Sequence, residues 1–267
     1  MSEQGTTTEP MAGPAPNASL RDLYETYFEA IPADTADLKR EVFRLRYQVL
    51  CVEHGYFTPD ELPDQMEQDH HDDHSAHCLL IHKPTGNLAG TVRLVLPKEP
   101  APGHGLPIQE YCRDPLIQDA AAFPVLQMGE ISRLSVSKQF RRRVTDTEYP
   151  DALDDNIGQP RREGEIRRLM PHITLGLMQG VLRMCVENNL PYVCASMEAQ
   201  LLRLLARVGI RFDNIGPPVE LFGLRQPCYR KGTELLDEVR REHPDVWDVL
   251  TVGGTYAAAL EALSGSH

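Results

Sequence analysis

The sequence has no cysteine pair at metal-binding spacing, no long apolar run and no excess of positive charge. Its six cysteines form no C-x-x-C pair, which excludes the common zinc and redox motifs. No run of about 18 or more apolar residues occurs, and the N-terminus does not resemble a secretion signal. We therefore expect a cytoplasmic protein without a transmembrane segment, whose cysteines are reduced and mostly buried.

Basic residues are fewer than acidic ones. The 39 acidic and 27 basic side chains give a formal charge of -12, which repels nucleic acid, so we expect no nucleic-acid partner. Residues 1–18 are rich in Thr, Pro, Gly and Ala, with Met1 and Met11 as the large apolar side chains. This segment is predicted to be a disordered tail. Residues 19–267 are predicted to form a single domain, for which 41% hydrophobic residues provide a core.

The periodicity of apolar residues predicts an α/β fold with a mixed central sheet flanked by helices. Two helices are expected before any strand, the first ending near Pro32 and the second reaching about Glu53. The expected elements after them are a β-hairpin (77–82 and 88–96), a crossover with a short helix (116–122), a long strand (125–136), a long loop (137–163), a central helix (165–188), a strand (192–196), a helix (198–208) and one or two strands within 211–223.

Four short motifs follow one another in a fixed order along this pattern. They are Arg46-Tyr47-Gln48-Val49-Leu50, Asp69-x-x-Asp72, Arg93 at the end of a G-x-V-R strand, and Glu130-Ile131-Ser132-Arg133. Together they resemble the motifs of acyl-homoserine-lactone synthases, the autoinducer synthases. The order of elements is similar to that of the GNAT fold, with extra N-terminal helices and a long loop after the fourth strand.

The C-terminal half has a second resemblance. Arg203-Leu204-Leu205, Gly209-Ile210 and Phe222-Gly223-Leu224-Arg225-Gln226-Pro227 resemble the exosortase-associated (PEP-CTERM) acyltransferases and the long-chain N-acyl amino acid synthases. Leu50 stands where the lactone synthases have Phe, and Tyr56 or Phe57 stands where they have Trp.

These resemblances imply an N-acyltransferase of the GNAT type. It would move a fatty acyl group from an acyl-carrier-protein or coenzyme A thioester to the amine of a small, amino-acid-like acceptor, by direct attack and with no permanently bound cofactor. An acidic acyl carrier protein is the expected partner. Two alternatives stay open: a GNAT-shaped protein that binds an acyl carrier or lipid without turnover, and a true acyl-homoserine-lactone synthase that uses S-adenosylmethionine.

The resemblance also suggests roles for the motif residues. Glu130 lies in an apolar strand, where a carboxylate must be paired or must line a cavity; it is either the proton acceptor or a structural partner of Arg93 or Arg133. Arg46, Arg93 and Arg133 are assigned to the catalytic site. The substrate-binding residues are expected to be Asp69, Asp72 and Ser132. Arg46 could instead be a solvated charge on a helix face.

Three further groups allow a functional and a structural interpretation. Arg141, Arg142 and Arg143 are expected to bind the donor or dock an acyl carrier protein, with a basic loop as the alternative. The acidic and histidine-rich stretch from Asp69 to His74 matches no closed zinc pattern, so no metal site is expected. Met178 belongs to the core or lines an acyl-chain tunnel, and Cys194 is interpreted as core.

Overall fold

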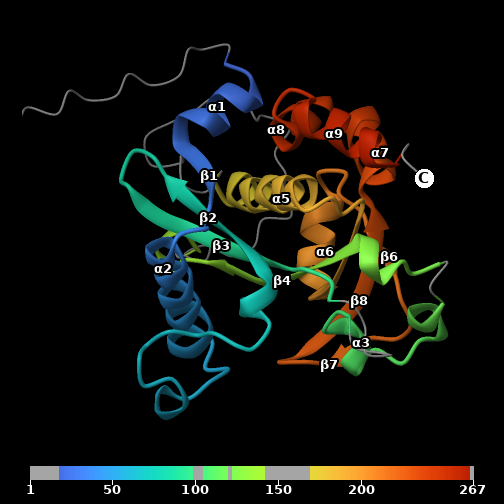
Figure 1. Cartoon of the computed structure of the whole chain (residues 1–267). Coiled ribbons are helices and arrows are strands. Elements are labelled where there is room, and N and C mark those ends of the chain that lie inside the picture. Colours follow the sequence, from blue (N-terminus) through green and yellow to red (C-terminus); the bar gives the residue numbers. More distant parts are fainter. Residues whose placement is uncertain (1–17, 99–104, 120–121, 142–168, 265–267) are drawn as a thin grey trace, which may run out of the picture.

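The central feature of the computed structural model, which describes residues 18–98, 105–119, 122–141 and 169–264, is a mixed β-sheet (Figure 1). Its strand order is β1-β2-β3-β4-β5-β8-β6, with β7 paired to β8. Neighbouring strands are antiparallel except β4 and β5, which run parallel. The strands are β1 (Phe28–Pro32), β2 (Ser75–His82), β3 (Asn87–Val95), β4 (Met128–Val136), β5 (Tyr192–Met197), β6 (Asp213–Asn214), β7 (Val219–Glu220) and β8 (Leu224–Lys231).

Helices surround this sheet and connect its strands. The α-helices are α1 (Leu20–Tyr27), α2 (Ala36–Arg46), α3 (Ile108–Tyr111), α4 (Lys138–Arg141), α5 (Leu169–Glu187), α6 (Ala199–Ala206), α7 (Gly232–Glu242), α8 (Pro244–Thr251) and α9 (Thr255–Ser264). A π-helical segment, η1 (Tyr47–Glu53), continues α2, and 3₁₀ turns cover Pro59–Glu61, Asp72–His74, Pro115–Gln118 and Val125–Gln127.

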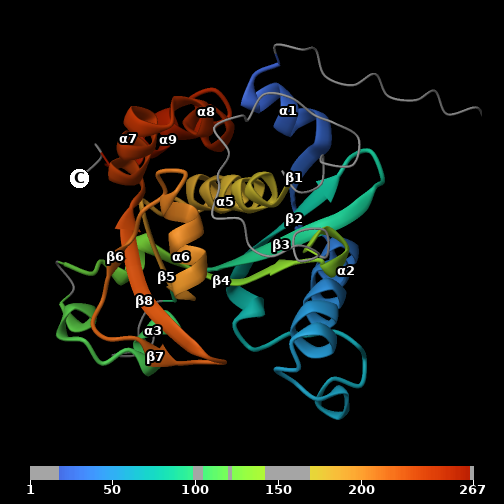
Figure 2. The same ribbon diagram turned by 180° about the vertical axis from the view of Figure 1, so that it is seen from behind.

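The two main helices pack on opposite faces of the sheet. Successive side chains of a strand alternate between its faces; Leu79 of β2 packs with Val42 of α2, whereas Leu80 belongs to the core cluster of α5. A glycine lets α5 approach β2 closely, since a Cβ at Gly180 would meet the sulfur of Cys78 at 2.4 Å. Figures 1 and 2 show α5 crossing the sheet, with α7, α8 and α9 grouped beside it.

A second apolar cluster covers the sheet on the α2 side and determines where the polar site lies. Val95, Met128 and Cys194, from three adjacent strands, pack there with Ile108 of α3. Because of the two-residue period, Glu130 of β4 points to the same face as Met128. The site described below therefore lies on the face opposite α5.

The predicted α/β fold with a mixed sheet is confirmed, and one N-terminal prediction is wrong. The hairpin, the long strand, the central helix and the strand after it all form close to their predicted limits. Pro171 lies in the first turn of α5, where a missing N–H costs nothing. The chain between Phe28 and Pro32, however, is not the end of a helix but strand β1, since it pairs with β2 along the edge of the sheet.

Candidate active site

Three arginines and three carboxylates form a closed ring of ion pairs. Arg46 of α2 donates to Glu67 and, through both terminal nitrogens, to Asp72 at 2.7 and 3.1 Å. Arg93 of β3 bridges Asp72 at 2.8 Å and Asp69 at 2.6 Å. Arg133 of β4 closes the ring, with 3.0 Å to Glu67 and 2.8 Å to Asp69.

This ring joins a helix, a loop and two strands within a largely dry environment. The side chains of Arg46, Arg93 and Glu67 are at most 2% exposed, whereas those of Arg133 and Asp69 are 21% and 23% exposed. Charges alternate around the ring and sum to zero when all six groups are ionised. Each guanidinium binds two carboxylates, so every buried charge has partners that offset its loss of hydration.

A bulge in β4 places Arg133 in the ring. Arg93 pairs with Ser132, but Thr91 two residues earlier pairs with Ser135, so β4 carries one extra residue. Arg133 adopts a φ of 53° within this stretch, a left-handed conformation that is uncommon outside glycine. The bulge turns the guanidinium of Arg133 toward Glu67, and the hydroxyl of Ser132 accepts a hydrogen bond from Arg93 at 2.9 Å.

The ring lowers the pKa values of Asp69 and Asp72. Burial alone would raise the pKa of Asp72, but the hydrogen bonds and charge of Arg46 and the charge of Arg93 outweigh it and lower that pKa. Burial would also raise the pKa of Asp69, but the hydrogen bond and charge of Arg93 outweigh it and lower that pKa. Both carboxylates are therefore ionised at neutral pH.

His77 lies beside the ring but is not part of its hydrogen bonding. Its Nε2 is 3.7 Å from Asp72, and neither ring nitrogen has a hydrogen-bond partner among the described residues. Burial lowers the pKa of His77 to about 4, so the imidazole is neutral at physiological pH. Phe43 contacts it edge-on, with ring centroids 5.8 Å apart.

Glu130 lies on the same face as the ring but is not part of its ion pairs. The side chain accepts a hydrogen bond from the backbone N–H of Ile108 at 2.6 Å and from the hydroxyl of Tyr111 at 2.9 Å. The residue is 3% exposed, and burial raises the pKa of its carboxyl to about 7 in spite of these two donors. Burial and the neighbouring Glu130 raise the pKa of Tyr111, which keeps the phenol protonated as a donor.

The pairing of the two parallel strands ends next to Glu130. Glu130 pairs with Cys194 and Ile131 with Ala195, and no pair between β4 and β5 follows among the described residues. Strand β4 nevertheless continues to Val136 along β3. The two strands therefore diverge just after Ile131, the residue that follows Glu130.

An apolar cavity lies on the other side of the sheet, between α5, β5 and the C-terminal helices. It has a volume of about 40 Å³, which corresponds to roughly three water-sized groups. Its lining is entirely apolar and includes Met178, Val193 and Leu235. Met178 is thus both a core residue and a wall of a cavity.

The structure brings most of the predicted site residues together. Arg46, Arg93, Arg133, Asp69, Asp72 and Ser132 form one connected network, which places Arg46 in the interior rather than on a solvated helix face. Glu130 makes no ion pair with Arg93 or Arg133; its described hydrogen bonds go to α3. Arg141 ends α4, whereas Arg142 and Arg143 lie outside the described residues.

Sequence reasoning did not identify two groups that complete the site. Glu67 is an acid in a polar stretch, and its N–H bond to the carbonyl of Phe43, 3.0 Å long, fixes it beside α2. Tyr111 lies in the crossover, in a segment with no strong pattern.

Burial raises the pKa of Cys194 well above its usual range, as expected for a core thiol. Within the described residues, no helix is both long and apolar enough to cross a bilayer.

Comparison with known proteins finds a matching family model and similar folds. Residues 45–148 match the family described as the acetyltransferase (GNAT) domain. No curated protein matches the sequence significantly. Among solved structures, TofI in a ternary complex with an inhibitor and MTA is 15% identical, with a TM-score of 0.54 over 84% of this chain and 97% of TofI.

Two further solved structures are similar at lower TM-scores. The CoA-dependent acyl-homoserine lactone synthase BjaI, with SAM and isopentyl-CoA, is 20% identical, with a TM-score of 0.48 over 89% of this chain and 98% of BjaI. FeeM, an N-acyl amino acid synthase from uncultured soil microbes, is 15% identical, with a TM-score of 0.46 over 79% of this chain and 94% of FeeM.

Residues 45–148 match a GNAT acetyltransferase domain, which supports an acyltransferase. The likeness to TofI shows that the chain has the same fold.

Proposed function

We propose that this acyltransferase moves a fatty acyl group from an acyl-carrier-protein or coenzyme A thioester to the amine of a small, amino-acid-like acceptor. The observation that carries the proposal is Glu130: a carboxyl with a pKa of about 7, buried next to the point where β4 and β5 diverge. A general base works best when its pKa lies near the working pH. The ring of ion pairs on the same face supplies the polar surroundings for an acceptor.

The reaction follows from the chemistry of these groups. The acceptor nitrogen attacks the thioester carbonyl, its proton passes to the Glu130 carboxylate, and the carbon–sulfur bond breaks to release the thiolate. The proton is then returned to the thiolate or to water. Tyr111 and the N–H of Ile108 hold the carboxylate in place. No covalent enzyme intermediate is needed.

The donor is proposed to enter between the diverging strands. Beyond Ile131 and Ala195 the two strands no longer bond to each other, which leaves backbone groups for a pantetheine arm. The acyl chain would then cross to the α5 side, where the cavity lined by Met178 is apolar. An acidic acyl carrier protein would dock on the arginines that follow β4, Arg141 to Arg143.

A thioester-consumption assay with a panel of amino acids and related amines tests this proposal. The parent is expected to release thiol only when a suitable amine is present, and Glu130→Gln should reduce the rate by about 10²-fold or more. Glu29→Gln, which removes an exposed carboxylate from another strand, β1, is the matched control and should keep the parent rate.

The outcomes distinguish the alternatives. Stoichiometric binding of an acylated carrier without thiol release would favour the GNAT-shaped binding protein. Activity that requires S-adenosylmethionine and yields a lactone would favour the autoinducer synthase. An undiminished rate in Glu130→Gln would remove Glu130 from the proton transfer. The resemblance to exosortase-associated acyltransferases stays a prediction.

A further inference from the structure

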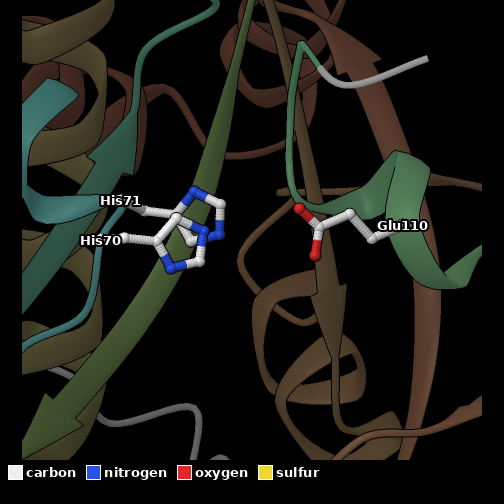
Figure 3. A group of neighbouring side chains, drawn as sticks. All are labelled: His70, His71 and Glu110. Carbon is white, nitrogen blue, oxygen red and sulfur yellow. The ribbon is translucent and has the colours of Figure 1, made fainter.

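Two adjacent histidines and one glutamate from a distant element converge at the rim of the site. His70 and His71 belong to the loop that carries Asp69, and Glu110 belongs to α3. One ligand atom from each of the three lies within 4.8 Å of the other two. Figure 3 shows the Glu110 carboxylate pointing toward the two imidazole rings.

The sequence alone argues against a metal at this loop because consecutive ligands rarely converge on one ion. Two features of the structure change that argument. The rings of His70 and His71 lie against each other, with centroids 3.9 Å apart and tilted by 40°, and each offers one nitrogen within 4.8 Å of the Glu110 carboxylate. The third ligand comes from Glu110, about forty residues further along the chain, and no local spacing reveals it.

The geometry points to a site for a divalent transition metal, with Zn²⁺ as the best match, held by His70, His71 and Glu110. Imidazole nitrogens favour zinc and its neighbours over magnesium or calcium, which prefer oxygen ligands alone. Two imidazoles and one carboxylate form a three-ligand set that leaves a fourth position for water.

The distances are within reach of side-chain rotation alone. Ligand atoms around one Zn²⁺ are about 3.4 Å apart, given bonds of about 2.1 Å and tetrahedral geometry. Closing the group from 4.8 Å therefore requires shifts on the order of 1 Å in side chains that are exposed or half-buried. His71 is the most restrained of the three, because its backbone N–H donates to Asp69 at 2.9 Å.

A bound cation would connect two segments that serve the site. The loop of His70 and His71 holds Asp69 in the ring, while α3 presents Tyr111 and Ile108 to Glu130. The metal would tie α3 to this loop and fix the distance between the ring and the proton acceptor. It is a positioning site, which does not depend on the proposed acyl transfer.

Direct titration of the untagged, chelator-treated full chain with Zn²⁺ tests the site. We expect one equivalent to bind, and Glu110→Gln and His70→Asn each to weaken the affinity by at least about tenfold. Asp73→Asn is the matched control, since it removes one exposed carboxylate from the same histidine-rich loop without touching the three ligands, and it should bind like the parent. Co²⁺ absorption provides a second readout of nitrogen and oxygen coordination.

The results separate this site from adventitious binding to the other histidines. Loss of the Co²⁺ spectrum in Glu110→Gln, with the spectrum kept in Asp73→Asn, supports it. Equal affinity in the parent and Glu110→Gln, or equal weakening by Asp73→Asn, overturns it. Circular dichroism of the metal-free variants checks that each is folded; because Glu110 and His70 come from different elements, either one that folds suffices for the test.

Discussion

The buried carboxyl of Glu130 should make the stability of the protein depend on pH in a way that needs no substrate to detect. Glu130→Gln keeps the size of the side chain and removes its titration. The amide oxygen can still accept the N–H of Ile108, and the amide NH₂ can donate to the hydroxyl oxygen of Tyr111, which replaces the two hydrogen bonds of the carboxyl. The substitution should therefore leave the fold intact.

The sign and size of this pH dependence follow from the pKa of Glu130. Burial raises it from 4.5 to about 7 in the folded protein, so the folded state holds its proton more tightly than the unfolded state. This contribution to stability is fully present below about pH 4.5 and is lost as the pH rises through about 7. The difference between the two pKa values corresponds to about 3 kcal/mol.

Urea unfolding followed by circular dichroism, from pH 4 to pH 8.5, measures the effect. The free energy of unfolding of Glu130→Gln minus that of the parent should rise by about 3 kcal/mol across this range. Other titrating groups, His77 among them, are common to both proteins and cancel. A difference that stays flat with pH would refute the raised pKa and with it the case for Glu130 as a base.

Other substitutions probe the rest of the site. The pKa of His77 is lowered from 6.5 to about 4, so its contribution to the free energy of unfolding is present above pH 6.5 and is lost as the pH falls toward 4. In urea unfolding over that window, the free energy of unfolding of His77→Gln should therefore fall by about 3 kcal/mol less than that of the parent. Arg46→Ala removes one of the two arginine partners of both Glu67 and Asp72 and leaves the buried ring with a net negative charge, so it should cost about 3–5 kcal/mol, whereas Arg44→Ala, on an exposed ion pair, should cost less than about 1 kcal/mol. Met178→Trp should shift a rate profile toward shorter acyl donors, while the volume-conserving Met178→Leu should not; best activity of the parent with an acetyl donor would contradict the tunnel. Changing residues 141–143 to Ser should raise KM for an acyl-carrier-protein thioester and weaken its salt dependence, and an equal loss on a short thioester mimic would remove the docking argument.

The strongly periodic regions of the chain could be predicted from the sequence. The hairpin around Gly86, the long strand that ends at Val136 and the central helix all have apolar residues at the correct spacing, and they form as expected. The ordered motifs also placed the arginines and aspartates of the ring in one site. Their exact partners could not be predicted, because the ring depends on the bulge at Arg133, which only the pairing of β3 and β4 reveals.

Elements that depend on contacts distant in sequence were missed. Phe28 continues the helical spacing of the preceding residues, yet it begins an edge strand because β2 offers backbone partners. Strand β8, Leu224–Lys231, lies beyond the last predicted strand and contains Pro227, a residue that is uncommon inside strands. Glu67 and Glu110 look like solvated acids, and only the fold brings one to Arg46 and Arg133 and the other to His71.

Mass spectrometry of lipids from cells that overproduce the protein tests the central claim most directly. The account predicts new N-acylated species, each made of a fatty acyl group joined by an amide bond to a small amine, in cells with the parent. These species should be strongly reduced in cells that overproduce Glu130→Gln to the same level. Identical lipid profiles for the parent and cells without the protein, despite folded protein and available acyl donors, would contradict N-acyl transfer.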